Sequence, residues 1–160
     1  MNRSFHFPRT VGLQGTLLVC LVVLLGGCGP SDRRPGLWLS GEVQAYPTDW
    51  TFADAHQEIA LQVGTPYLLP HSVTIWCATL DGDLYLAASR PEEKNWPGWV
   101  DDRPDVRLKI GDGVYDARLV PLTDDALIRR VTAVQSQKYG FPMPEGPTGA
   151  RYWRVAPRGG

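Results

Sequence analysis

Two Asp–Gly pairs, each set between apolar runs, constrain the fold of this chain more than any other feature of its sequence. The runs 73–79 and 84–88 flank Asp81-Gly82-Asp83, and the runs 106–110 and 114–122 flank Gly111-Asp112-Gly113. Because glycine accepts the positive φ of a tight turn, an Asp–Gly pair between apolar runs is a strong hairpin signal. The sequence therefore predicts two antiparallel hairpins.

Further segments alternate between apolar and polar residues, which is the pattern of half-buried strands. They cover residues 37–43, 59–63 and 151–156. About six strands with one helix favour a mainly β fold, and a small antiparallel barrel in particular. A β-sandwich is the alternative architecture.

One segment near the C-terminus has the pattern of a helix. Leu127 and Val131 fall on one side at helical spacing, and Gly140 is a natural stop. Thr123 is the expected N-cap, followed by two acidic residues that suit the helix dipole. The next residues, 141–149, hold several prolines and glycines and are expected to form a loop.

The N-terminal segment is organised as an export signal. An apolar stretch follows Arg3 and Arg9 and closes on Leu24-Leu25-Gly26-Gly27-Cys28. A basic start, an apolar middle and small residues at the cut are the order of a secretory signal. A cysteine directly after those residues resembles the lipobox of bacterial lipoproteins, which implies acylation of Cys28.

The lipobox resemblance divides the chain into three parts. These are a signal peptide over 1–27, a lipid-anchored tether over 28–36 and a domain over 37–160. An aspartate directly after the acylated cysteine would resemble an inner-membrane retention signal. The sequence has Gly29 at that position. We therefore expect the protein to be anchored in the outer membrane with its domain facing the periplasm. A secretory signal without lipid is the alternative.

Charge and cysteine content narrow the range of partners. Removal of the signal takes away two of the 16 basic residues and none of the 17 acidic ones, which leaves a formal charge of −3. A chain with that charge and no dense basic patch is not expected to bind nucleic acid. Cys77 is then the only thiol besides the acylated one, and its apolar surroundings favour a buried structural role over a reactive one.

The middle of the chain carries a family resemblance. The segments concerned are Pro70–Trp76, Asp81–Ser89, Lys94–Val100, Pro104–Ile110 and Val114–Arg118. Together they resemble the split β-barrel superfamily of pyridoxamine-phosphate-oxidase-like flavin proteins, and most closely its deazaflavin-dependent nitroreductase-like branch. The resemblance implies a six-stranded antiparallel split barrel of FMN-binding type that often forms a homodimer.

The same resemblance implies a small-molecule site that takes FMN or a deazaflavin. Ser89, Arg90 and Lys94 would hold a phosphate, since arginine and lysine are the usual phosphate-binding cations. A role of Arg90 and Lys94 as solvated loop charges is an equal alternative. The residues expected around the ring system are Trp96, Trp99, His71 and Ser72. Pro97 and Gly98 predict an exposed loop for the two tryptophans, where a lid or interface role is an equal alternative.

Two functions follow as alternatives. The first is an oxidoreductase in which a bound flavin-like cofactor moves hydride and the protein supplies orientation. The second is a non-enzymatic envelope interaction or scaffold module that has lost its cofactor, which the acidic pairs 92–93 and 101–102 beside the supposed phosphate loop favour. The sequence offers no nucleophile with a credible base and no metal-ligand spacing, so no catalytic side chain is assigned.

Overall fold

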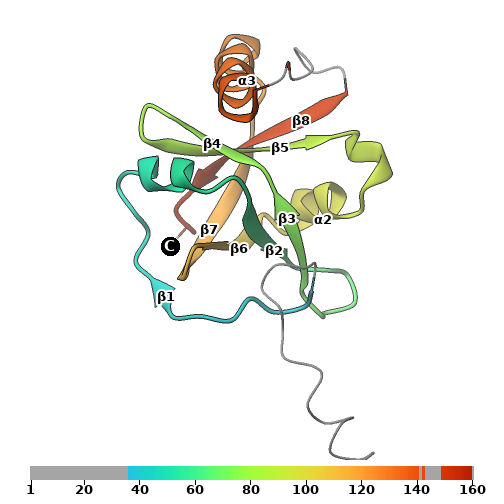
Figure 1. Ribbon diagram of the computed structural model, residues 1–160. Coiled ribbons are helices and arrows are strands. Elements are labelled where there is room, and N and C mark those ends of the chain that lie inside the picture. Colours follow the sequence, from blue (N-terminus) through green and yellow to red (C-terminus); the bar gives the residue numbers. More distant parts are fainter. Residues whose placement is uncertain (1–35, 141, 143–148, 160) are drawn as a thin grey trace, which may run out of the picture. The chain divides into compact units, whose positions relative to one another are not determined.

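A single curled sheet of eight strands forms the body of the protein in a computed structural model, which describes residues 36–140, 142 and 149–159 (Figure 1). The strands run in the order β3-β2-β6-β7-β8-β5-β4, and β1 pairs in parallel with β7 while every other pairing is antiparallel. Their bounds are β1 Val43–Gln44, β2 Ile59–Val63, β3 His71–Ile75, β4 Cys77–Leu80, β5 Asp83–Ser89, β6 Asp105–Ile110, β7 Gly113–Pro121 and β8 Ala150–Ala156.

The sheet closes on itself through the chain between β3 and β4. Only Trp76 separates these strands, and yet β3 pairs with β2 whereas β4 pairs with β5. The two strands at the ends of the strand order, β3 and β4, are therefore halves of one extended segment. This segment bends at Trp76, so that its first half pairs with β2 and its second half with β5. Counted in this way the main sheet is a six-stranded barrel with β1 added, and it is split where β3 diverges from β5. The predicted mainly β split barrel is confirmed.

Both predicted hairpins are present and both have two-residue turns. Asp81 and Gly82 join β4 to β5 with φ values of 55° and 83°, and Leu80 pairs with Asp83 across the turn. Gly111 joins β6 to β7 with a φ of 57°, and Ile110 pairs with Gly113. At Asp81-Gly82 two consecutive residues have positive φ, which matches the twist of the flanking strands and favours Asp–Gly. The second turn is Gly111-Asp112 and not the Asp112–Gly113 pair, and only its first residue has positive φ, a position that favours glycine.

The barrel interior is filled by alternate residues of the strands. β6 alternates strictly between half-buried and buried positions, and β2 does the same in the opposite phase. Trp50 and Trp153 are the largest fully buried side chains, and Cys77 has no exposed surface. The buried thiol predicted for Cys77 is confirmed among the described residues.

The predicted C-terminal helix is α3, Asp125–Tyr139, which packs against β4 at one end of the barrel (Figure 1). Gly140 ends it with a φ of 74°, as predicted. The N-cap prediction was wrong by one residue. Asp124, not Thr123, accepts hydrogen bonds from the backbone N–H groups of Ala126 and Leu127, because its extended backbone aims the carboxylate at the first turn.

A second α-helix, α2, covers Trp96–Asp102, where the sequence predicted an exposed loop. Pro97 is tolerated because it stands in the first turn, whose N–H groups have no helical partner. Trp96 and Val100 face the core, so tertiary packing stabilises a helix that its Pro–Gly pair disfavours. The predicted exposure of Trp96 is therefore wrong. Two short 3-10 helices, η1 Thr51–Ala55 and η2 Pro91–Glu93, complete the elements of the described residues.

The N-terminal part of the domain departs from the predicted strand over 37–43. Only Val43 and Gln44 form β1, and Gly36 makes an isolated bridge with Ser72 of β3. Leu37 and Trp38 lie exposed between these two points, because no neighbouring strand covers them there. Within the described residues no helix has the length and apolar character that a bilayer crossing requires. Cys28, the predicted signal peptide and the tether before residue 36 lie outside the described residues.

Candidate functional site

A groove of about 240 Å³ opens where β3 diverges from β5, at the split of the barrel. It brings together three residues that the sequence predicted for a ligand site, namely Ser89 at the end of β5, Lys94 before α2 and Trp96 in α2. The other lining residues come from the bend of the β3–β4 segment, β5, α3 and β8: Thr74, Ile75, Trp76, Ala87, Ala88, Gln135, Ala150 and Tyr152.

Three aromatic side chains line the groove, and each contacts a neighbouring side chain. Trp76 stacks on Tyr139 of α3 with ring centroids 4.5 Å apart and an angle of 16° between the planes. Trp96 packs against the buried Trp153 at 5.0 Å. Tyr152 is buried, and its Oη lies 3.1 Å from the Thr132 hydroxyl oxygen, within hydrogen-bond distance. Rigid aromatic walls of this kind suit a flat ring system.

Gln135 is the polar group that distinguishes the groove. Its side chain is 1% exposed, and its amide nitrogen Nε2 has no hydrogen-bond partner among the described residues. A buried unsatisfied donor costs about 1–3 kcal/mol. An acceptor oxygen or nitrogen on a bound molecule would remove that cost. Sequence reasoning missed Gln135, although it stands at helical spacing from the buried Ile128 and Val131 and so on the buried face of α3.

The basic residues predicted to hold a phosphate are engaged within the protein. The Lys94 ammonium donates a hydrogen bond to the backbone oxygen of Ser89 at 2.5 Å. Arg90 has a left-handed backbone, with a φ of 47°, and pairs with Glu93 at 3.1 Å. A phosphate would have to displace both interactions.

The second acidic pair near this loop is also partly neutralised. Asp101 of α2 accepts two hydrogen bonds from the Arg151 guanidinium, at 2.6 and 2.9 Å. These bonds hold the pKa of the Asp101 carboxyl below its usual range. The negative charge of Asp101 is therefore paired with Arg151 of β8 and would repel an anionic ligand less strongly.

The remaining predicted site residues lie away from the groove lining. His71, at the start of β3, places its ring edge-on to Trp99 of α2, with centroids 5.4 Å apart. Tyr67 contacts the same Trp99 ring at 5.9 Å. Ser72 is buried, and its hydroxyl donates to the backbone oxygen of Leu37 at 2.7 Å. The structure thus separates His71, Ser72 and Trp99 from Ser89, Lys94 and Trp96.

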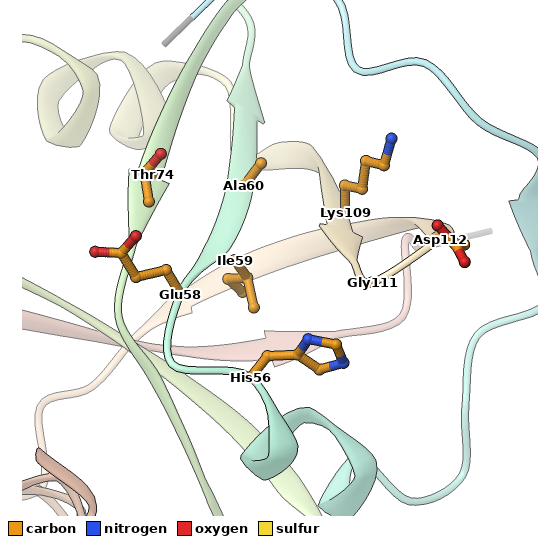
Figure 2. Close-up of a pocket in the computed structure, with 8 residues that line it drawn as sticks. All are labelled: His56, Glu58, Ile59, Ala60, Thr74, Lys109, Gly111 and Asp112. Carbon is orange, nitrogen blue, oxygen red and sulfur yellow. The ribbon is translucent and has the colours of Figure 1, made fainter. Parts of the chain in front are cut away.

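A larger hollow of about 710 Å³ lies on the outer face of β2 and β6 (Figure 2). It is lined by His56, Glu58, Ile59, Ala60, Thr74, Lys109, Gly111 and Asp112. Figure 2 shows the Glu58 carboxylate and the Lys109 ammonium pointing away from each other. No set of three His, Cys, Asp or Glu side chains among the described residues could hold a metal ion. The groove is the better candidate site despite its smaller volume, because it alone of the two contains a buried unpartnered donor.

Cys77 is placed for structure and not for nucleophilic chemistry. Burial raises the pKa of its thiol, and the Lys138 ammonium, 3.6 Å from Sγ, offsets only part of that effect. Lys138 also contacts Asp54 at 3.3 Å. A buried thiol whose pKa is raised is a poor nucleophile at neutral pH.

Comparison with solved structures identifies the fold. A conserved hypothetical protein from Mycobacterium tuberculosis matches with 15% identity over 76% of this chain and 87% of that chain, at a TM-score of 0.57. A candidate pyridoxamine 5′-phosphate oxidase from Listeria innocua matches with 16% identity over 67% of this chain and 88% of that chain, at 0.53. The chain has the split-barrel fold of the pyridoxamine-phosphate-oxidase-like proteins.

The same barrel occurs in proteins whose names indicate other ligands. The haem storage protein HutZ from Vibrio cholerae matches the split barrel with 14% identity over 68% of this chain and 87% of that chain, at a TM-score of 0.52. No family model and no curated protein sequence matches the chain. At these identities the comparisons establish the split-barrel fold, and function has to be argued from the groove.

Proposed function

We propose that this split-barrel protein is a cell-envelope lipoprotein that binds a planar heterocyclic molecule in the groove. The observation that carries the binding proposal is Gln135, a buried amide donor without a described partner, in a groove that three aromatic side chains also line. A flat heterocycle with a carbonyl or ring nitrogen at its edge would stack on Trp76 or Trp96 and accept the Gln135 hydrogen bond. Both features are needed because stacking alone does not fix orientation.

The ring system of a flavin or deazaflavin fits this description better than a whole phosphorylated cofactor does. The groove volume of about 240 Å³ lies below the range of about 300–1,000 Å³ typical of small-molecule sites. Lys94 and Arg90 are already bound to Ser89 and Glu93. We therefore expect the ring to bind in the groove and the phosphate to add little affinity in one chain. A homodimer, which the family resemblance implies, would supply further surface beside the partly exposed Trp76.

A bound flavin or deazaflavin would supply hydride-transfer chemistry, which would make the protein an oxidoreductase. The residues of this chain would bind and orient the ring: Gln135 at its edge, and Trp76 and Trp96 against its faces. No side chain of the groove is assigned a proton-transfer role. The contrasting proposal, an envelope interaction or scaffold module without cofactor, predicts that no planar heterocycle binds.

Ligand titration tests the binding proposal directly. Tryptophan fluorescence of the purified protein is followed against FMN, riboflavin and a deazaflavin, and size-exclusion chromatography with light scattering gives the oligomeric state. Riboflavin, which lacks the phosphate, should bind within about fivefold of FMN, because one charge-assisted contact more or less is worth at most about 1 kcal/mol at an exposed site. Fluorescence unchanged by all three ligands would overturn ligand binding and leave the scaffold function.

The variant Gln135→Leu sharpens the test, with Gln137→Leu on the exposed side of α3 as its matched control. Loss of the Gln135 donor should weaken heterocycle binding by roughly tenfold, the value of one hydrogen bond at a buried site. The same change should stabilise the free protein, because the unsatisfied amide is gone. Gln137→Leu should do neither. Weaker binding without a gain in stability would show that Gln135 has another partner.

The envelope location rests on the order of residues at the N-terminus, with Cys28 directly after small residues that close an apolar stretch. Membrane fractionation of cells expressing the chain or its Cys28→Ser variant tests it. Acylated protein should be found with membranes and the Cys28→Ser variant should be found in the soluble fraction. Equal distribution of the two proteins would refute lipid anchoring.

A further inference from the structure

Five exposed apolar side chains lie at the end of the barrel where the described chain begins. Leu68 is 87% exposed, Trp38 59% and Tyr67 56%, and Leu37 and Leu69 are each about half exposed. Leu37 and Trp38 come from the first described segment, and the other three come from the loop between β2 and β3. These five residues form the apolar patch. Single exposed apolar residues need no explanation, but a group that includes tryptophan and tyrosine does.

Hydrogen bonds hold the two segments of the apolar patch together. Gly36 and Ser72 exchange backbone hydrogen bonds of 3.1 and 2.7 Å, and the Ser72 hydroxyl donates to Leu37. Within the loop, the Thr65 hydroxyl donates to the backbone oxygen of Leu69, and the Leu68 N–H donates to that of Thr65. Figure 1 shows the first described residues beside the loop that joins β2 and β3. The patch is therefore presented by ordered backbone.

Leu68 is unfavourable for folding in two ways. Its φ of 67° places a leucine in the left-handed region, which costs about 1–2 kcal/mol relative to residues that tolerate it, and its side chain is almost wholly exposed to water. Glycine or asparagine would be favoured at such a turn. A residue that opposes both local backbone preference and solvation indicates a surface that something else covers.

The apolar patch is also the part of the domain reached first from the proposed anchor. Gly36, which pairs with Ser72 inside the patch, is eight residues after Cys28, so the fully extended tether spans at most about 28 Å. The tether carries Arg33 and Arg34. Beside the loop, the Arg103 side chain packs close to Gly64, where a side chain in place of the glycine hydrogen would meet Arg103 Cδ at 3.2 Å. Basic residues next to a membrane surface are attracted to anionic headgroups.

We propose that the apolar patch docks into the headgroup region of the bilayer that holds the lipid anchor. Tryptophan and tyrosine prefer this depth, where the ring is apolar and its polar atom stays hydrated, and exposed leucines add apolar burial. The anchor removes most of the entropic cost of a second contact, because the tether keeps the patch at high local concentration beside the membrane. This inference rests on the proposed lipid anchoring and adds to it a fixed orientation of the barrel.

The test uses the full acylated chain reconstituted into vesicles of phosphatidylcholine and phosphatidylglycerol, with brominated acyl chains in a parallel set. A polarity-sensitive fluorophore is attached to Leu69→Cys, and to Ala133→Cys on the exposed face of α3 as the matched position. The label is specific, since Cys28 is acylated on this proposal and Cys77 is fully buried. Flotation of the vesicles reports anchoring separately from docking.

Docking predicts blue-shifted emission at position 69 that brominated lipid quenches, and aqueous, unquenched emission at position 133. Adding Leu68→Asn should reduce the docked population about tenfold, because partial burial of one leucine is lost, while asparagine keeps the turn intact. Val43 is an exposed apolar residue outside the patch, so Val43→Asn should leave the docked population unchanged.

Protein that floats with vesicles but gives equal, aqueous emission at positions 69 and 133 overturns docking and leaves lipid anchoring standing. Blue-shifted emission at position 69 that brominated lipid does not quench would show that a second protein copy covers the patch, and this result also overturns membrane docking. Protein that does not float overturns both proposals.

Discussion

Removal of the Tyr139 hydroxyl should destabilise the bend between β3 and β4 on which the split of the barrel depends. Tyr139 Oη accepts a hydrogen bond from the Cys77 N–H at 2.9 Å, and it lies 2.9 Å from the backbone oxygens of both Gln57 and Cys77. Its ring stacks on Trp76, the residue at the bend. Tyr139 is therefore a single side chain that contacts the bend by ring and by hydroxyl.

The variant Tyr139→Phe keeps the ring and deletes only the hydroxyl. It leaves the N–H of Cys77, a residue with no exposed surface, without this partner, which costs about 1–3 kcal/mol. We expect a loss of about 2 kcal/mol in the free energy of unfolding, measured by urea denaturation with an unchanged m-value. Tyr67→Phe is the matched control, because Tyr67 is 56% exposed and the same deletion there should change stability by less than about 0.5 kcal/mol. Equal effects of the two variants would refute the proposed role of Tyr139 at the bend.

Three further predictions concern the helix cap, one ion pair and the buried thiol. Asp124→Ala should cost about 1 kcal/mol in urea denaturation and Thr123→Ala less than about 0.5 kcal/mol, because Asp124 holds the N-cap bonds; the reverse order would restore Thr123 as the cap. The Arg107 guanidinium, 2.9 Å from Asp116, lowers the pKa of that carboxyl, so its stabilising contribution is complete above about pH 4 and is lost as the pH falls further. Asp116→Asn should therefore cost up to about 1 kcal/mol at pH 7 and progressively less below pH 4, and a pH-independent difference would contradict this. Cys77 should react with iodoacetamide at pH 8 only after unfolding in denaturant; rapid labelling of the native protein would show that the thiol is accessible.

Local signals in the sequence predicted the elements whose conformation is decided locally. The turn at Asp81-Gly82 needs two residues with positive φ, and the sequence supplies residues that accept it. The seven-residue helix α2 could not be predicted in this way. Its first turn contains Pro97 and Gly98, and it forms because Trp96 and Val100 fill the core, which is information that the local sequence does not hold.

The candidate site was predictable to a similar extent. Ser89, Lys94 and Trp96 follow a strand end and stay close in space because so few residues separate them. Gln135 comes from a distant helix and was missed, although a glutamine at the spacing of buried residues is a detectable exception to the apolar pattern of α3. His71 and Ser72 were expected at the same site, but β3 runs away from the groove towards the loop that bears the apolar patch, so its first residues lie at the other end of the strand.

β3 joins the two proposed functional surfaces and limits their separation. Leu69 belongs to the apolar patch and Thr74 lines the groove, and five residues of extended chain span at most about 17 Å. This length is the largest separation that Leu69 and Thr74 can have, however the barrel is tilted. A docked patch would therefore keep the groove within about 17 Å of the headgroup layer. Flat aromatic molecules collect at this layer for the same reason that tryptophan rings do. Docking would thus hold the groove where planar ligands are most concentrated. The Leu68→Asn variant, which releases the barrel from the membrane, should therefore lower the apparent affinity for such a ligand on vesicles. The same substitution in unacylated protein, measured in solution without detergent, should leave the affinity unchanged.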